Sequence, residues 1–175
     1  PHLQKEIKTS FDLFGIRDFI PPYHTYAPCV SVLHPAIASN INQATIKPFL
    51  VVDHFKRTID FPHDHTRMIN KPNCMHTIAS AISEHDFIIS SSYHVAYWAT
   101  LLKKKTIVIG ESLPPKFYTL KHPIVIAPRF NDELLEQAIR HEDAYDVCLE
   151  DTKKFKNQIR EVTGFDLGFA NPGFN

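Results

Sequence analysis

Residues 86–110, DFIISSSYHVAYWATLLKKKTIVIG, constrain the fold of this chain more than any other stretch. They begin with the apolar run 87–89 and pass through three consecutive serines into apolar residues at helical spacing over 93–102. A second β-branched run follows at 106–109. This pattern predicts a strand, a helix and a strand in close succession. Because such βαβ units build parallel sheets, we expect an α/β fold.

Similar patterns elsewhere extend this unit into a larger sheet. Apolar runs predict further strands at 13–16, 48–54 and 124–126. Apolar residues at helical spacing predict further helices at 74–83, 131–141 and 145–162. The polar residues 60–73 predict a loop, and Pro21, Pro22 and Pro28 predict an extended crossing segment that ends near residue 35. The predicted fold is a small Rossmann-like sheet of parallel strands in three layers.

The length of 175 residues fits a single α/β domain over 1–175. Within it we expect a leading segment at 1–12, a core at 13–163 and a tail at 164–175. The chain begins with Pro1 rather than Met, which favours a fragment of a longer protein with two domains.

The composition narrows the classes of function. The 19 basic and 19 acidic residues leave no net charge, so no basic excess would hold nucleic acid. No apolar run approaches the ~18–20 residues of a membrane span, so any association with a membrane would be peripheral. The three cysteines lack CxxC spacing, which predicts free and inert thiols in a reducing compartment and hence a cytoplasmic protein.

The turn after the strand at 86–90 is a candidate anion site. The first backbone N–H groups of a helix have no partner within the helix and carry the positive end of its dipole, so they bind phosphates and carboxylates. The hydroxyls of Ser91 and Ser92 add donors, and His94 can supply a hydrogen bond or a proton. No glycine-rich phosphate loop is present, since the chain has only 5 glycines. A serine that merely caps the helix is the simpler interpretation.

Residues 87–109 resemble the C-terminal signature of polysaccharide pyruvyl transferases, in which a strand ends in S-R-x-H-G and a helix, a lysine-marked turn and another strand follow. Gly15-Ile16-Arg17-Asp18 is similar to a short v-R-D segment of that family, and Lys116-Phe117 is similar to a later K-F pair. The resemblance covers about residues 14–128. It implies the C-terminal half of a two-domain GT-B fold and transfer of a pyruvyl group from phosphoenolpyruvate to a cell-surface glycan.

The resemblance also implies roles for individual residues. Arg17 and His94 would be catalytic, with Arg17 gripping the donor and His94 neutralising the leaving group. Ser91, Ser92, Tyr93 and Lys116 would bind the anionic donor. No cofactor is implied. The acceptor sugar would be held by a preceding domain, so this chain alone would bind weakly and turn over nothing.

Two positions differ from the family motif, because Ser92 replaces its arginine and Val95 its last glycine. A serine cannot make the two parallel hydrogen bonds of a guanidinium, so other donors remain open. One alternative is a glycosyltransferase domain that binds the phosphates of a nucleotide sugar, with Glu111 on the ribose. Another is a non-catalytic binding domain with a degenerate site.

A third alternative is a metal site. Asp53 and His54 end a predicted strand, and His63, Asp64 and His65 follow in the predicted loop. Alternating histidines place two imidazoles on one side of an extended chain, and a carboxylate would complete a zinc site. Because the spacing fixes no third ligand, we expect no metal here.

Overall fold

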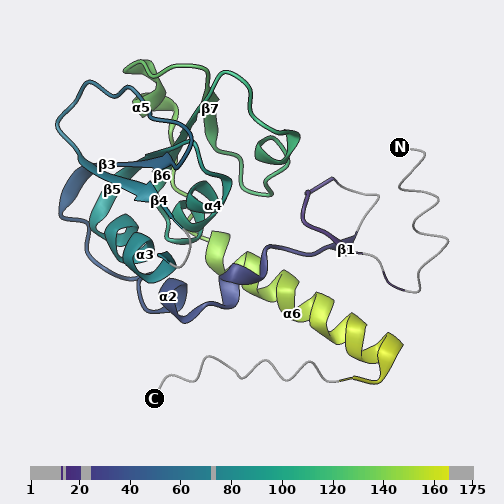
Figure 1. The fold of residues 1–175 in the computed structure, drawn as a ribbon. Coiled ribbons are helices and arrows are strands. Elements are labelled where there is room, and N and C mark those ends of the chain that lie inside the picture. Colours follow the sequence, from purple (N-terminus) through teal and green to yellow (C-terminus); the bar gives the residue numbers. More distant parts are fainter. Residues whose placement is uncertain (1–12, 14, 21–24, 72–73, 166–175) are drawn as a thin grey trace.

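The structure is a computed structural model that describes residues 13, 15–20, 25–71 and 74–165. The predictions for the leading segment 1–12, for residues 21–24 of the crossing segment and for most of the tail lie outside these residues. The described remainder of the crossing segment is not extended throughout, because it contains a 3-10 helix at Val30–Leu33. The described chain forms a twisted sheet with helices on both faces and a small two-stranded sheet beside it (Figure 1).

The main sheet has five strands, all parallel, in the order β4-β3-β5-β6-β7. Its strands are β3 (Lys47–His54), β4 (Thr66–Asn70), β5 (His85–Ser90), β6 (Lys105–Ile109) and β7 (Val125–Ala127). The small parallel sheet pairs β1 (Gly15–Ile16) with β2 (Thr25–Tyr26). The α/β class and the Rossmann-like parallel sheet predicted from the sequence are therefore confirmed.

Helices cover the two faces unequally. The helical segments are η1 (Val30–Leu33), α2 (Pro35–Ala38), α3 (Met75–Glu84), α4 (Tyr93–Leu101), η2 (Pro115–Phe117), α5 (Glu133–Gln137) and α6 (Ala144–Thr163). In Figure 1, α2, α3 and α4 lie on one side of the sheet and α5 on the other. None of the helices in the described part of the chain combines the length and apolarity that a bilayer crossing needs.

Side chains that point alternately to the two faces of the sheet form the two hydrophobic cores. Leu50 and Val52 of β3 belong to the cluster under α3 and α4, whereas Val51 between them belongs to the cluster under α5. Successive side chains of a strand point to opposite faces, so an unbroken apolar run marks a strand that is buried on both sides. Such burial explains why β3 and β5 are readily predicted from the sequence.

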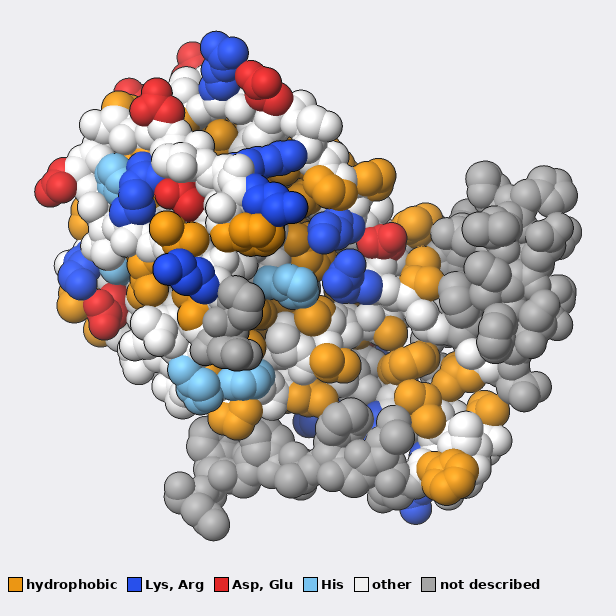
Figure 2. Space-filling model, viewed as in Figure 1, with side chains coloured by type: hydrophobic (Ala, Val, Ile, Leu, Met, Phe, Trp, Pro, Cys, Tyr) orange, Lys and Arg blue, Asp and Glu red, His pale blue; other side chains and the backbone are white. Residues whose placement is uncertain are grey.

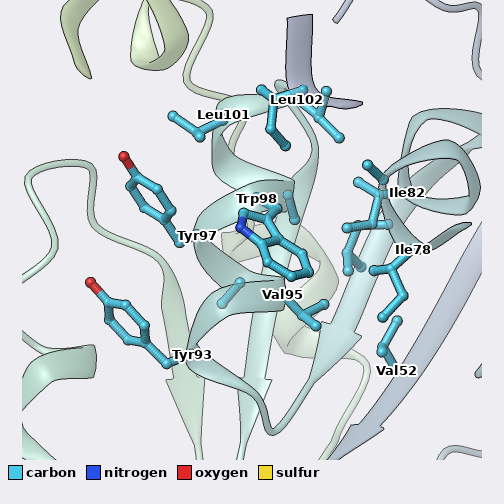
Figure 3. Packing of buried hydrophobic residues seen from close by; sticks show 14 of the residues in the cluster. Val52, Ile78, Ile82, Tyr93, Val95, Tyr97, Trp98, Leu101 and Leu102 are labelled. Atoms are coloured by element: carbon cyan, nitrogen blue, oxygen red, sulfur yellow. The ribbon is translucent and has the colours of Figure 1, made fainter. Parts of the chain in front are cut away.

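Helix α4 is apolar around its whole circumference. Figure 3 shows Tyr93 and Tyr97 on one side of it, and Trp98 and Val95 toward Ile78 and Ile82 of α3. Eight of its nine residues are buried, and His94 alone is exposed. A helix that is hydrophobic on all sides belongs inside a protein, so α4 is held by α3, the sheet and α6 together.

The sequence predicted a loop over the polar region 60–73. This is wrong in part, because β4 forms there at the edge of the sheet. Only one side of β4 pairs, and the burial of its five residues alternates weakly, with Met68 packed on the core and Ile69 49% exposed. Edge strands need little apolar character, so an apolar run does not reveal them.

The predicted helix at 131–141 is also wrong in extent, because α5 ends at Gln137. Ala138 is extended and buried against the sheet. The following segment lets Arg140 pair with Asp86 and places the His141 imidazole on the Pro123 carbonyl. These contacts across the chain replace the helical hydrogen bonds that local spacing favours.

The three lysines that follow α4 are not all exposed to solvent. Lys103 takes a left-handed conformation, with φ 58°, where the helix stops. The Lys104 ammonium is buried and donates to the Ser83 carbonyl at 2.7 Å and to Thr45 Oγ1 at 2.9 Å. Burial lowers the pKa of Lys104, and these acceptors keep its polar head satisfied.

The long helix α6 is anchored at its first half. Its buried residues are Ala144, Cys148 and Thr152, and its contacts are to α4, η1 and β2. The predicted helix at 145–162 is confirmed, and Gly164, which has φ 71°, follows its last residue. Farther along, the Phe155 ring packs on Gly15, where an added Cβ would come within 2.5 Å of it. A side chain at the start of the small sheet would therefore have to displace the Phe155 ring.

We predict that Asp53→Ala lowers the free energy of unfolding by about 2–4 kcal/mol, because it removes a buried carboxylate with two partners. Asp53 Oδ2 lies 2.6 Å from Arg67 Nη1, and Oδ1 accepts the Ile59 N–H at 2.8 Å. Urea denaturation measures the change. Glu150→Ala, which breaks only an exposed pair with Lys154, should stay within about 0.5 kcal/mol. Equal losses in both variants would contradict the prediction.

We predict that His85 makes the fold sensitive to acid. Its ring is buried between the Ala81 carbonyl and Thr66 Oγ1, and burial lowers the pKa of His85 below its ordinary 6.5. Below about pH 6.5 the unfolded chain therefore binds a proton that the folded chain rejects, and stability falls as the pH falls. Urea unfolding between about pH 7 and pH 5 should show a smaller loss for His85→Gln than for the parent chain. Parallel losses would exclude His85 as the cause.

Candidate functional site

A cleft with a volume of about 1210 Å³ lies at the carboxyl ends of β3, β4 and β5. Numbered along the chain, the five strands lie in the order 2-1-3-4-5. The chain leaves β3 toward β4 on one side, and it leaves β5 toward β6 on the other. Ligands of doubly wound sheets bind where the order reverses in this way, outside the strand ends. The cleft occupies that position, between His54 and Ser91.

The hydroxyl groups of three serines take part in the hydrogen bonds that shape the turn between β5 and α4. Ser90 is fully buried; its hydroxyl donates to the Val52 carbonyl at 2.8 Å and accepts the Ser92 N–H at 3.0 Å. Ser91 Oγ accepts the His54 N–H at 3.2 Å, and Ser92 Oγ accepts from Asn70 Nδ2 at 2.8 Å. Each of the last two hydroxyls still has its own hydrogen to donate. The predicted anion-binding residues Ser91 and Ser92 both line the cleft.

The N-terminus of α4 opens into the same cleft without a side-chain cap. Ser92 is the N-cap residue, but its side chain makes no capping hydrogen bond, because its oxygen already faces Asn70. The simpler interpretation, a serine that caps the helix, is therefore wrong. The first N–H groups of α4 keep their capacity to bind an anion, and the helix dipole favours a negative charge there.

His94 lies in the first turn of α4, lines the cleft and is exposed. Its ring centroid is 6.0 Å from that of Trp98 and 5.6 Å from that of Tyr93. The imidazole is thus supported by aromatic side chains of its own helix while its polar edge is open to solvent and to Cys29. The predicted catalytic residue lies beside the predicted anion-binding turn.

The cleft wall is basic although the chain has no net charge. The side chains that carry or can take positive charge are Lys56, Arg57, Lys71, Lys116, His34, His54, His76 and His94. Among the described residues that line it, none is an aspartate or a glutamate. Figure 2 shows lysine, arginine and histidine side chains gathered around the middle of one face. A wall of this composition attracts anions.

Arg17 and Lys116 both approach the ring of Tyr93. The Arg17 guanidinium lies 4.6 Å and the Lys116 ammonium 5.0 Å from its centroid, within the range of cation–π contacts. Burial raises the pKa of Tyr93 to about 12, against the opposing effect of Arg17, so the phenol is neutral. Lys116 and Tyr93 line the cleft, whereas Arg17 is not among its lining residues. Arg17 Nε is buried without a hydrogen-bond partner in the described part of the chain.

Sequence reasoning missed most of the basic wall. Lys56 and Arg57 follow β3, and Lys71 follows β4. The signal was present, because residues just after parallel strands meet at the ligand-binding edge. Lys71 could not be placed at this edge from the sequence, because the polar strand β4 before it has no apolar run.

A second cleft of about 820 Å³ lies beside the first, at the ends of β6 and β7. Ser91 and Arg57 line both clefts, so the two are neighbours. Glu111, the residue expected on a ribose in the nucleotide-sugar alternative, lines this second cleft. Its carboxylate pairs with Arg129 at 3.1 Å on the surface.

The residues considered for a metal have other partners. The Asp53 carboxylate is held by Arg67, His63 Nε2 lies 2.6 Å from Asp132, and His65 Nδ1 faces the His63 carbonyl. Within the described ranges, no three His, Cys, Asp or Glu side chains gather in a way that would hold a metal ion.

We predict that inorganic phosphate binds the cleft at low salt and changes the fluorescence of Trp98, which lines it and is the single tryptophan of the chain. Lys116→Ala should weaken binding roughly 5-fold, which corresponds to about 1 kcal/mol for one solvent-exposed ion pair. Added salt should weaken binding as well. The matched control Lys154→Ala, on the exposed side of α6, should not change the affinity. Equal affinities in both variants would contradict a site at the cleft.

Comparisons with protein-family models, with curated proteins and with solved structures give no match.

Proposed function

We propose that this chain is the donor-binding part of a group transferase of cell-surface polysaccharide synthesis, similar to pyruvyl transferases. The observation that carries the proposal is a single cleft that joins three features: an uncapped helix N-terminus, an exposed His94 and a basic wall without carboxylates among its described residues. Together they favour a small donor with phosphate and carboxylate groups, and phosphoenolpyruvate has both.

In this proposal the donor phosphate rests on the N–H groups that begin α4, with the hydroxyl hydrogens of Ser91 and Ser92 as further donors. Lys116 binds the second anionic group. When the bond between the transferred carbon and the phosphate oxygen breaks, His94 gives that oxygen a hydrogen bond or a proton. A glycan hydroxyl forms the new carbon–oxygen bond and gives up its proton to a base of the preceding domain, which also holds the acceptor. Donors aimed at a developing negative charge are worth roughly 100- to 1,000-fold in rate each.

The size of the cleft is compatible with two substrates. Ligand sites for drug-sized molecules commonly measure about 300–1,000 Å³. At about 1210 Å³ the cleft has room for phosphoenolpyruvate and for part of an acceptor sugar. Phe55, which is 62% exposed at its rim, offers an aromatic face for such a sugar. The Arg17 role stays a proposal that requires its guanidinium to turn from Tyr93 toward the donor.

A nucleotide sugar is the second candidate donor, favoured by the adjoining cleft. A diphosphate at Ser91 and Arg57 would place a nucleoside in the second cleft, near Glu111. Binding a ribose there would require Glu111 to exchange its pair with Arg129 for the sugar hydroxyls. Either donor acts in the cytoplasm, where both kinds of compound are made, and no membrane span is needed.

We predict that phosphoenolpyruvate binds saturably, that inorganic phosphate competes with it, and that UDP, GDP and CMP bind more weakly. Titration calorimetry measures all of these directly. His94→Ala should weaken phosphoenolpyruvate binding several-fold, whereas His141→Ala, a control outside the cleft, should leave it unchanged. Tighter nucleotide binding would replace the first candidate by the second.

Activity separates catalysis from mere binding. In the intact protein with its glycan acceptor, His94→Ala should lower the rate of phosphate release at saturating donor by 100-fold or more, on the scale of one lost stabilising group. An unchanged rate would leave the non-catalytic binding domain as the better account.

A further inference from the structure

Cys29 lies in the cleft among groups that stabilise a thiolate. It is partly buried just before η1, and its Sγ accepts a hydrogen bond from the Ser31 hydroxyl at 3.2 Å. Ser31 in turn accepts the Trp98 Nε1–H at 3.0 Å, which fixes the hydroxyl in place. His94 lines the same cleft as Cys29, and its ring centroid lies 6.0 Å from that of Trp98, so the imidazole belongs to the same group of side chains as the thiol.

The electrostatic setting agrees with this geometry. Burial alone would raise the pKa of the Cys29 thiol, but hydrogen bonds from His94 and Ser31 outweigh it and lower this pKa from 9.0 to about 7. The phenols of Tyr93 and Tyr97 also interact with the thiol. Burial raises the pKa of both phenols, so they stay neutral and add no competing charge near neutral pH.

A thiol beside an imidazole in an open cleft is the arrangement of an activated cysteine nucleophile. We propose that Cys29, paired with His94, is a nucleophilic site of the cleft that forms a thioether with small molecules carrying an electrophilic carbon. The thiol proton passes to the imidazole, the sulfur forms a bond to the carbon, and the leaving group departs with its electron pair. This proposal does not rest on the transferase function, since it requires only the thiol, the imidazole and access.

The magnitude of the effect can be bounded. At pH 7 a thiol with a pKa of about 7 is roughly half ionised, against roughly one per cent for an ordinary thiol with a pKa of 9.0. A lower pKa also makes the thiolate a weaker nucleophile, by a factor of roughly 8 for two pKa units. Cys29 should therefore react roughly 5- to 10-fold faster than an unperturbed thiol at neutral pH.

The chain contains its own control thiols. Cys74 is also partly buried and lines the same cleft, but its Sγ lies on the oxygens of Lys71 and Asn70 instead of an imidazole. Cys148 is 1% exposed and held inside the core, and burial raises the pKa of its thiol. All three cysteines are free, so one reaction compares them in the same molecule.

The test is alkylation of the whole chain by iodoacetamide across a pH range, with peptide mass spectrometry to read each cysteine separately. We expect the Cys29 rate to rise with a midpoint near pH 7 and to exceed that of Cys74 at neutral pH. His94→Asn should move the midpoint toward 9.0, Ser31→Ala should move it in the same direction, and Cys74→Ser should leave it unchanged.

A Cys29 midpoint near 9.0 in the parent chain would overturn the proposal, as would a midpoint that His94→Asn leaves in place. Circular dichroism confirms that each variant is folded, and the parent profile decides the matter even if a variant does not fold. If Cys29 is reactive but phosphoenolpyruvate does not bind, only the transferase proposal is contradicted. Failure of the transferase proposal can therefore be distinguished from failure of the cysteine proposal.

Discussion

The candidate site depends on the two hydrogen bonds of the buried Ser90 hydroxyl. This hydroxyl ties the end of β5 to the Val52 carbonyl of β3 and holds the Ser92 N–H, so that the chain turns into α4 at a fixed place. Ser91 and Ser92 then reach the ends of β3 and β4 through His54 and Asn70. Because each serine oxygen is used to brace the turn, none caps the helix, and the N-terminus of α4 faces the cleft unoccupied by side chains.

The parts of the fold that could be predicted are those in which local pattern and tertiary burial agree. The strands around 48–54 and 86–90 are buried on both faces, and their continuous apolar runs indicate this burial. Where tertiary contacts decide, the sequence misleads: β4 is polar because it lies at an edge, and α5 stops early because Arg140 and His141 find partners elsewhere. Lys104 lies in a run of three lysines, yet its ammonium is buried, and the Ser83 carbonyl and the Thr45 hydroxyl compensate this burial.

The candidate site also has a part that could be predicted from the sequence and a part that could not. The turn at 90–94 could be found from sequence because a serine run before an apolar helix is local. The basic wall could not be found from composition, since equal numbers of acidic and basic residues give no net charge. Its lysines, arginine and histidines come from loops far apart in the chain and gather only when parallel strands end at a common edge. The Cys29–His94 pair has the same origin, because sixty-five residues separate its partners.

The uneven anchoring of α6 has a consequence for motion. Its fully buried side chains all lie between Ala144 and Thr152, so the turns beyond them hide little apolar surface. Opening those last turns costs far less than global unfolding, and their amide protons should exchange with solvent long before those of the first half. Since Phe155 also packs on Gly15, fraying of this helix would release the small sheet with it. Motion at this end of α6 would also reach Arg17, which follows β1 and lies on the ring of Tyr93 in the cleft wall.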